Sequence, residues 1–224
     1  MIAKNFREGA EGGLINYSFS DVATGFGIVK FNAFASTDNS GEEFSNTTAD
    51  IDIQSDPQGK QLEISETDFT KKGTINFDNP PNNFLTRIKG KGFVDFTFAM
   101  ATNTARIPTG YVIAKIQVVD KTDVVIATIG SVQSAELVGV GTGTTFKTLF
   151  LIIDCDETNI RPTDRLRLSM ELWGKAPAAG GGFAYIVLPF DPANRELSVL
   201  NAPNIIAATN HTYLKWYVPY KIDL

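Results

Sequence analysis

Large apolar residues alternate with polar or small residues along much of the chain. Residues 93–100 run Phe-Val-Asp-Phe-Thr-Phe-Ala-Met, and residues 165–172 run Arg-Leu-Arg-Leu-Ser-Met-Glu-Leu. A period of two residues sends alternate side chains to opposite faces of a β-strand, so that one face meets a core and the other meets water. The pattern therefore predicts strands at both places. The inward side chains of the first strand are predicted to be Val94, Phe96, Phe98 and Met100.

Similar patterns, separated by turn-forming residues, predict further strands. Residues 120–123 (Asp-Lys-Thr-Asp) suit a four-residue hairpin loop, and the two prolines within 78–83 cannot lie inside a sheet. Short alternating pieces at 51–54 and 62–65 flank a Pro-Gly turn and predict a hairpin. The remaining predicted strands are 14–19, 27–34, 74–77, 85–88, 111–119, 124–129, 146–154, 183–188 and 212–220.

The order of these segments indicates the fold class. Parallel strands need crossover connections of about a dozen or more residues, usually helical, and the pattern contains no long helical period. We predict an all-β protein, an antiparallel two-sheet β-sandwich of jelly-roll type with about 10–12 strands. A polar, glycine-rich arm is expected over residues 1–13 and one sandwich domain over 14–224, with 78–83 as a candidate internal boundary.

Composition and charge argue against nucleic-acid and membrane partners. The 224 residues are 43% hydrophobic and 20% charged, as in an ordinary globular chain, and the net charge is −5. Nucleic-acid binding rests on clustered cations, and the chain has no basic run, so we expect no nucleic-acid partner. No apolar stretch approaches the ~18 residues of a membrane span, so we expect no membrane partner. The single cysteine, Cys155, excludes an intrachain disulfide and favours assembly in a cytoplasm.

Few residues suggest catalysis or cofactor binding, and we predict a protein that is not an enzyme and uses no cofactor. The only histidine, His211, precedes the last predicted strand and is interpreted as a solvated loop residue. Cys155 has the parity of inward residues, and its acidic neighbours are expected to raise the pKa of its thiol. Glu171 and Trp173 point to the same side of one strand, a pair that sugar sites use.

Acidic side chains after residue 153 are candidates for a cation site. Asp154, Asp156 and Glu157 could offer oxygen ligands to Ca²⁺, but their spacing departs from the EF-hand pattern. The favoured interpretation is a solvated turn, so we predict no bound metal.

Aromatic residues near the two ends are the candidates for an interface. If Leu214, Trp216 and Val218 face the core, Tyr213 and Tyr217 face outward, while Pro219 could shift the phase of Tyr220. Outward tyrosines suit a protein interface or a sugar-binding platform, unless both faces of the strand are covered. In the predicted arm, Phe6 and Arg7 are further interface candidates.

Three segments carry a resemblance to a known group of proteins: the glycine-rich start at 8–13, the strand at 165–174 and the strand that closes the chain at 217–224. In these the chain resembles the small jelly-roll virion structural proteins of tailed phages and related viruses. The resemblance implies a non-enzymatic decoration, cement or minor capsid subunit that binds capsid or other virion proteins. It also implies assembly in the host cytoplasm, a place in the virion, and a homo-oligomer such as a trimer. A carbohydrate- or receptor-binding β-sandwich module remains the alternative.

Overall fold

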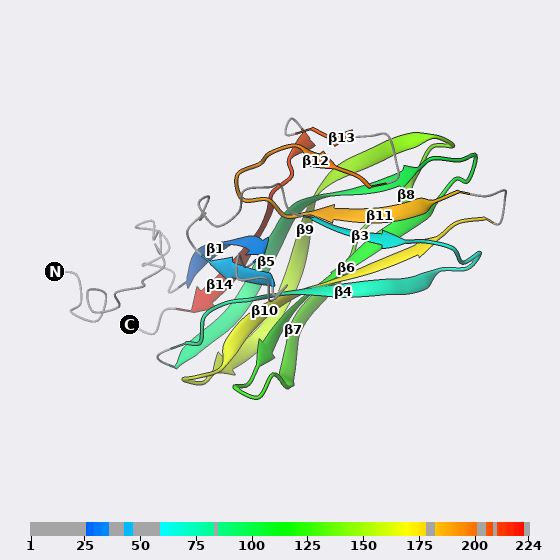
Figure 1. The fold of residues 1–224 in the computed structure, drawn as a ribbon. Helices are drawn as coiled ribbons and strands as arrows, with labels where there is room; N and C mark the ends of the chain where they lie inside the picture. The colour runs from blue at the N-terminus through cyan, green and yellow to red at the C-terminus, as the bar shows by residue number, and fades with distance from the viewer. Residues whose placement is uncertain are drawn as a thin grey trace.

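The computed structural model describes residues 26–35, 43–46, 59–82, 85–177, 182–200, 205–207 and 210–221, and within them every regular element is a strand (Figure 1). The all-β prediction is confirmed. The strands are β1 (Phe26–Ala35), β2 (Glu43–Asn46), β3 (Gly59–Glu63), β4 (Thr70–Asp78), β5 (Thr86–Thr102), β6 (Thr109–Val119), β7 (Val125–Gln133), β8 (Leu137–Val138), β9 (Gly143–Ile160), β10 (Arg165–Lys175), β11 (Ala184–Pro189), β12 (Leu197–Ser198), β13 (Ile205–Ile206) and β14 (Leu214–Lys221).

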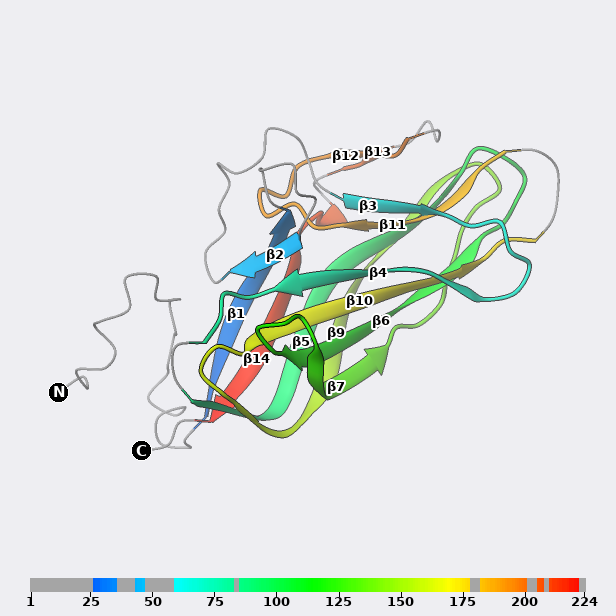
Figure 2. The same ribbon diagram turned by 60° about the horizontal axis from the view of Figure 1, so that its bottom comes forward.

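Twelve of these strands form one hydrogen-bonded sheet that folds back on itself into a sandwich (Figures 1 and 2). The path runs β3-β11-β5-β14-β1-β2-β4-β10-β6-β7, with β9 added to β5 and β8 added to β6. Its turning point is the short parallel contact between β2 and β4, and the other pairings within the described ranges are antiparallel. We call the strands before this contact, with β9, the first layer, and those after it, with β8, the second layer. The predicted antiparallel sandwich is thus confirmed.

Strand β5 is the centre of the first layer. Along one edge it pairs with β9 from Thr86 to Thr102, and along the other it pairs first with β14 and then with β11. The sequence pattern predicted two strands here, 85–88 and 93–100. The structure joins them, because Gly90 adopts a φ of 120° at a register shift and so absorbs the irregularity without ending the strand.

The core lies between the layers and follows the predicted parity. The four inward side chains predicted for β5 are fully buried, and so are Trp216 and the inward side chains of β10 opposite them. The members of this main core on β5 and β10 are Ile88, Val94, Phe96, Phe98, Met100, Leu166, Leu168, Met170 and Leu172.

Strand β9 is longer than predicted, and this corrects the interpretation of the acidic residues. It continues beyond Asp154, the last residue of the predicted strand, through Asp156 and Glu157 to Ile160, where the pattern had suggested a turn. The first half of β5 supplies the pairing partners, and Lys89 there binds Glu157 across the strands. Cross-strand ion pairing therefore outweighs the low strand propensity of acidic residues.

The two layers also meet where β7 approaches β9. A Cβ atom added at Gly130 would lie 2.5 Å from the carbonyl oxygen of Asp154 and 2.5 Å from Ile153 Cγ2. Only a residue without a side chain allows this approach of two strands that share no ladder.

A second, smaller core covers part of the outer surface of the first layer. The strands β12 and β13 pair with each other and place Val199 and Ile206 over Ala99, Ala101 and Val187. The sequence over 191–210 has no firm period, in keeping with strands of which only two residues each are paired.

Some predictions lie outside the described residues: the arm over 1–13, the strand over 14–19 and the first half of the hairpin, 51–54. Of the second half, 62–65, residues 62 and 63 lie in β3, which pairs with β11. No helix long and apolar enough to span a membrane occurs in the part of the chain that the structure describes.

We expect Phe96→Ala to lower the free energy of unfolding by about 3–5 kcal/mol, because it empties a fully buried site in the main core. The control is Phe150→Ala on the neighbouring strand, where 59% of the side chain is exposed and the expected cost is about 1 kcal/mol or less. Urea denaturation followed by circular dichroism measures both. Equal losses would contradict the assignment of inward and outward faces.

Candidate functional site

Four large side chains form an exposed surface on the outer side of the first layer. Phe93 comes from β5, Phe150 and Ile152 from β9, and Tyr217 from β14; we call this group the aromatic face. Phe93 pairs in register with Ile152 on one side and with Tyr217 on the other. Its ring stacks on Phe150 with centroids 5.2 Å apart and meets Tyr217 edge-on at 6.5 Å. Phe150 and Ile152 are 59% and 49% exposed, so the surface is open to solvent.

The alternation of each strand places these residues outward. Val94 and Phe96 enter the core, which directs Phe93 and Asp95 to the outer side, and Trp216 and Val218 do the same for Tyr217. All three strands are paired with neighbours, so the backbone beneath the aromatic face is held in place.

A polar group borders the aromatic face on β14 and β5. Lys215 pairs in register with Asp95, and its Nζ lies 3.7 Å from the centre of the Tyr213 ring. Burial, together with the charge of Asp95, raises the pKa values of Tyr213 and Tyr217. Burial also lowers the pKa of Lys215, and the neighbouring Lys30 adds to this. Both tyrosines therefore keep their hydroxyl proton at neutral pH and can donate hydrogen bonds.

The predicted interface residues lie in different environments in the structure. Tyr213 and Tyr217 are partly buried and lie on the outer side, as the pattern of Leu214, Trp216 and Val218 suggested. Tyr220 instead packs against the main core, since it follows the register shift after Tyr217. Phe6 and Arg7 lie outside the described residues.

Sequence reasoning missed Phe93, Phe150 and Ile152 as surface residues. A signal was present for the β9 pair, because residues 149–153 are apolar without interruption (Leu-Phe-Leu-Ile-Ile). A strand with one wet face should alternate, so an unbroken apolar run in it indicates an apolar outer face as well.

The acidic residues of β9 are exposed and do not converge. Glu157 binds Lys89 at 2.8 Å and Arg87 at 3.5 Å, and the hydrogen bond from Lys89 is the main cause of its lowered pKa. Within the described ranges no three His, Cys, Asp or Glu side chains are placed to hold a metal ion. Between Asp154 and Asp156, Cys155 points inward, and burial followed by these two charges raises the pKa of its thiol.

A second cluster lies on the outer side of the second layer around Glu171 of β10. The Oε1 atom of Glu171 accepts hydrogen bonds from Lys71 of β4 and Lys115 of β6, each at 2.8 Å. Its Oε2 atom accepts a hydrogen bond from the indole nitrogen of Trp173 at 3.3 Å. Burial alone would raise the pKa of Glu171, but the two lysines and Trp173 together lower it to about 2. With Tyr111, which pairs with Trp173 in register, these residues form the Glu171 cluster.

The aromatic part of the Glu171 cluster is a cross-strand pair. The rings of Tyr111 and Trp173 are nearly parallel, at 9°, with centroids 6.0 Å apart. Phe69 packs on Tyr111 at 5.1 Å, and Lys175 Nζ lies 4.3 Å from the Phe69 ring centre. The Glu171–Trp173 pair suggested by the sequence is thus present, with cations added that the pattern did not reveal.

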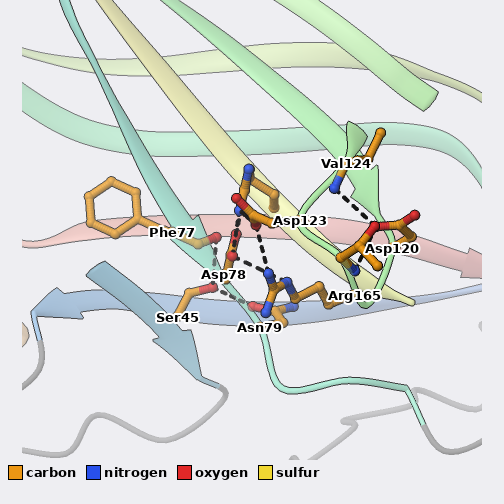
Figure 3. A network of polar contacts seen from close by, with 10 residues as sticks. Ser45, Phe77, Asp78, Asn79, Asp120, Asp123, Val124 and Arg165 are labelled. Atoms are coloured by element: carbon orange, nitrogen blue, oxygen red, sulfur yellow. Dashed lines mark hydrogen bonds and ion pairs between the residues drawn. The ribbon is translucent and has the colours of Figure 1, made fainter. Parts of the chain in front are cut away.

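A third polar group ties the turning point of the sheet to the β6–β7 hairpin (Figure 3). Arg167 binds both oxygens of Asp78 and also Asp123, which Arg165 binds at 2.7 Å. Burial raises the pKa of Asp123, but the two arginines outweigh it and lower that pKa. Asp120 accepts hydrogen bonds from the backbone N–H groups at 122 and 124, which orders the hairpin loop. Every carboxylate of this group is engaged within the fold, so we assign it a structural role.

Comparison with known proteins shows a similar fold and does not indicate a function. No family model matches the chain, and no curated protein sequence matches it. A CocE/NonD family hydrolase from Staphylococcus aureus is similar in structure, with a TM-score of 0.50 and 8% identity over 88% of this chain and 37% of the hydrolase. An α-amino acid ester hydrolase has a TM-score of 0.45 with 7% identity, over 85% of this chain and 36% of its own. The VP2 subviral particle of infectious bursal disease virus has a TM-score of 0.29 with 11% identity, over 88% and 37%.

The chain therefore spans little more than a third of each of these proteins. At 8% identity the first likeness shows a shared β-sandwich fold, and such a fold hosts many unrelated functions.

We expect Glu171→Gln to lower the free energy of unfolding by about 1–3 kcal/mol at pH 7, because two ammonium groups lose their shared anion. The lowered pKa fixes the sign of the pH dependence. Stabilisation by Glu171 is complete above its ordinary pKa of 4.5 and is lost as the pH falls toward about 2. The difference between wild type and variant, measured by urea denaturation, should therefore shrink on acidification from pH 5 to pH 3. A difference that stays constant would contradict the assigned ion pairs.

Proposed function

We propose that this chain is a non-enzymatic virion structural protein, an accessory or minor capsid subunit that binds neighbouring capsid proteins through the aromatic face. The observation that carries the proposal is the exposure of Phe150 and Ile152 beside Phe93 and Tyr217 on three paired strands. The resemblance to jelly-roll virion proteins supplies the class of partner.

The chemistry of the aromatic face suits a protein partner. Phe and Tyr are enriched at the centre of protein interfaces, where charged residues are depleted. Here the apolar side chains adjoin one another, while Lys30, Asp95 and Lys215 lie along their border on β1, β5 and β14. An apolar centre with a polar rim is the usual arrangement of an interface.

The rigidity of the face favours binding as well. Ordering a flexible side chain or loop on association costs about 0.5–1.5 kcal/mol per rotamer-rich side chain. The aromatic face lies on strands whose backbones are already paired, and three of its four side chains are rings with few rotatable bonds. Little additional order is needed when a partner docks, so more of the buried apolar area contributes to affinity.

The proposal also covers where the protein is made and where it resides. A subunit of this kind is made in the host cytoplasm and resides in the virion, where a homo-oligomer could present several copies of the aromatic face at once. Multiple copies would raise the avidity for a capsid surface without new contacts.

Co-sedimentation with virus particles tests this function. Particles are purified from cells that produce all virion proteins except this chain, and the separately made chain is then added. We expect wild type to co-sediment, and Phe150→Ser and Ile152→Ser each to weaken binding by about tenfold or more, since each removes a large apolar contact.

Ile126→Ser is the matched control, because Ile126 lies on β7 of the second layer and is 54% exposed, close to the 49% of Ile152. It should bind as wild type does. Failure of the wild-type chain to co-sediment, or equal loss in all three variants, would overturn the proposal.

A further inference from the structure

We propose that the Glu171 cluster is a binding site for a saccharide that carries a carboxylate, such as a uronic or sialic acid unit. The site lies on the second layer, away from the strands that carry the aromatic face, and does not depend on the virion role.

The first argument is an excess of positive charge held in place. Lys71 and Lys115 donate to the same oxygen atom, Glu171 Oε1, so one carboxylate lies between two ammonium groups. The Glu171 side chain is only 12% exposed, whereas those of Lys71 and Lys115 are 41% and 28% exposed. The cluster therefore presents a net positive charge to solvent on a chain whose own net charge is −5. An anion is the ligand that this local excess attracts.

The second argument is the number of hydrogen-bond donors. An ammonium group has three N–H donors, and each of the two lysines gives one to Glu171. The others can be shared with a ligand. Because both lysines are anchored to one atom, their ammonium groups stay close together, and a ligand carboxylate can accept from both.

The third argument is the flat ring beside these cations. Trp173 is partly exposed, and its indole N–H bond to Glu171 fixes the ring orientation. Tyr111 stacks nearly parallel to it, with ring centroids 6.0 Å apart, and helps to hold the indole in place. Pyranose rings have apolar faces of C–H groups that pack on aromatic rings, while their substituents reach polar groups at the ring edge.

The two lysines and the Trp173 ring together favour an acidic saccharide over other classes of ligand. A protein interface is depleted in lysine, and a nucleic acid needs more cations along its backbone than this cluster offers. A neutral sugar would use the ring and leave the charge excess unmatched. A saccharide with a carboxylate uses both.

The positions of the two tryptophans give a direct assay. The chain contains only Trp173 and Trp216, and Trp216 is fully buried between the layers. A ligand on the Glu171 cluster should therefore change the emission of Trp173 alone. The probes are tetragalacturonate and 3′-sialyllactose, each titrated beside its uncharged counterpart, the methyl-esterified tetragalacturonate and lactose.

We expect at least one acidic probe to change the emission and bind about tenfold or more tightly than its neutral counterpart, with affinity falling as salt is added. Trp173→Phe should abolish the signal. Lys115→Gln should weaken binding by about tenfold, because one charge-assisted hydrogen bond is lost. Lys147→Gln, at an exposed position of β9, should bind as wild type does.

Several results would overturn the inference. They are no emission change with either acidic probe at millimolar concentration, equal binding of the neutral counterparts, or equal binding of sodium acetate, which would indicate a simple anion contact. Circular dichroism of each variant separates a lost site from a lost fold. Since the aromatic face is unchanged in these variants, their failure would leave the co-sedimentation result unaffected.

Discussion

Strand β5 pairs with three others, and its alternating side chains divide between the main core and the surface. The burial of Val94, Phe96, Phe98 and Met100 is the interaction on which the arrangement depends, since it fixes the distance between the layers and the register of β9, β14 and β11 around it. A one-residue slip would exchange the two faces and expose these large side chains. The same constraint determines what lies outside. The side chains of β5 that alternate with the core residues point outward, so they must either face solvent or be covered by another part of the chain or by a partner.

The outer side of β5 meets this requirement differently along its length. Near the C-terminal end of β5, small residues, Ala99 and Ala101, allow β12 and β13 to pack closely and form the second core. Near its middle, the larger Phe93 lies beside Phe150 and Ile152, and the surface stays exposed. One sheet face thus carries both a covered and an open apolar region. The covered region shows how a short extended segment can pack on such a surface, which is why a protein partner is a reasonable occupant of the open one.

The second layer differs in the chemistry of its outer side. There the strands β4, β10 and β6 carry charged groups that are paired across strands, from the Arg167–Asp78 pair at one end to the Glu171 cluster at the other. Cross-strand pairs of opposite charge stabilise a sheet and keep its surface solvated. The two outer sides are therefore suited to different contacts, one apolar and one polar.

The sequence alone predicts the elements with a strong period and leaves their pairing open. The inward parity of β5 and of Trp216 on β14 followed from alternation. The extension of β9 beyond Asp154 could not be foreseen, because acidic residues favour turns and the cationic partners of Glu157, Lys89 and Arg87, lie about 70 residues away in the chain. For the same reason the meeting of Lys71, Lys115 and Glu171 was hidden, since three strands distant in sequence contribute to it. Glu171 and Trp173, two residues apart, were the part of that cluster visible in advance.

Hydroxyl-radical footprinting of the chain, free and bound to virus particles, tests most directly whether the aromatic face is the docking surface. The account predicts that modification of Phe93, Phe150 and Tyr217 falls several-fold on binding, while Val125 and Ile126 of β7 react at the same rate in both states. Unchanged modification of the aromatic face in a chain that is bound, with protection elsewhere, would contradict it.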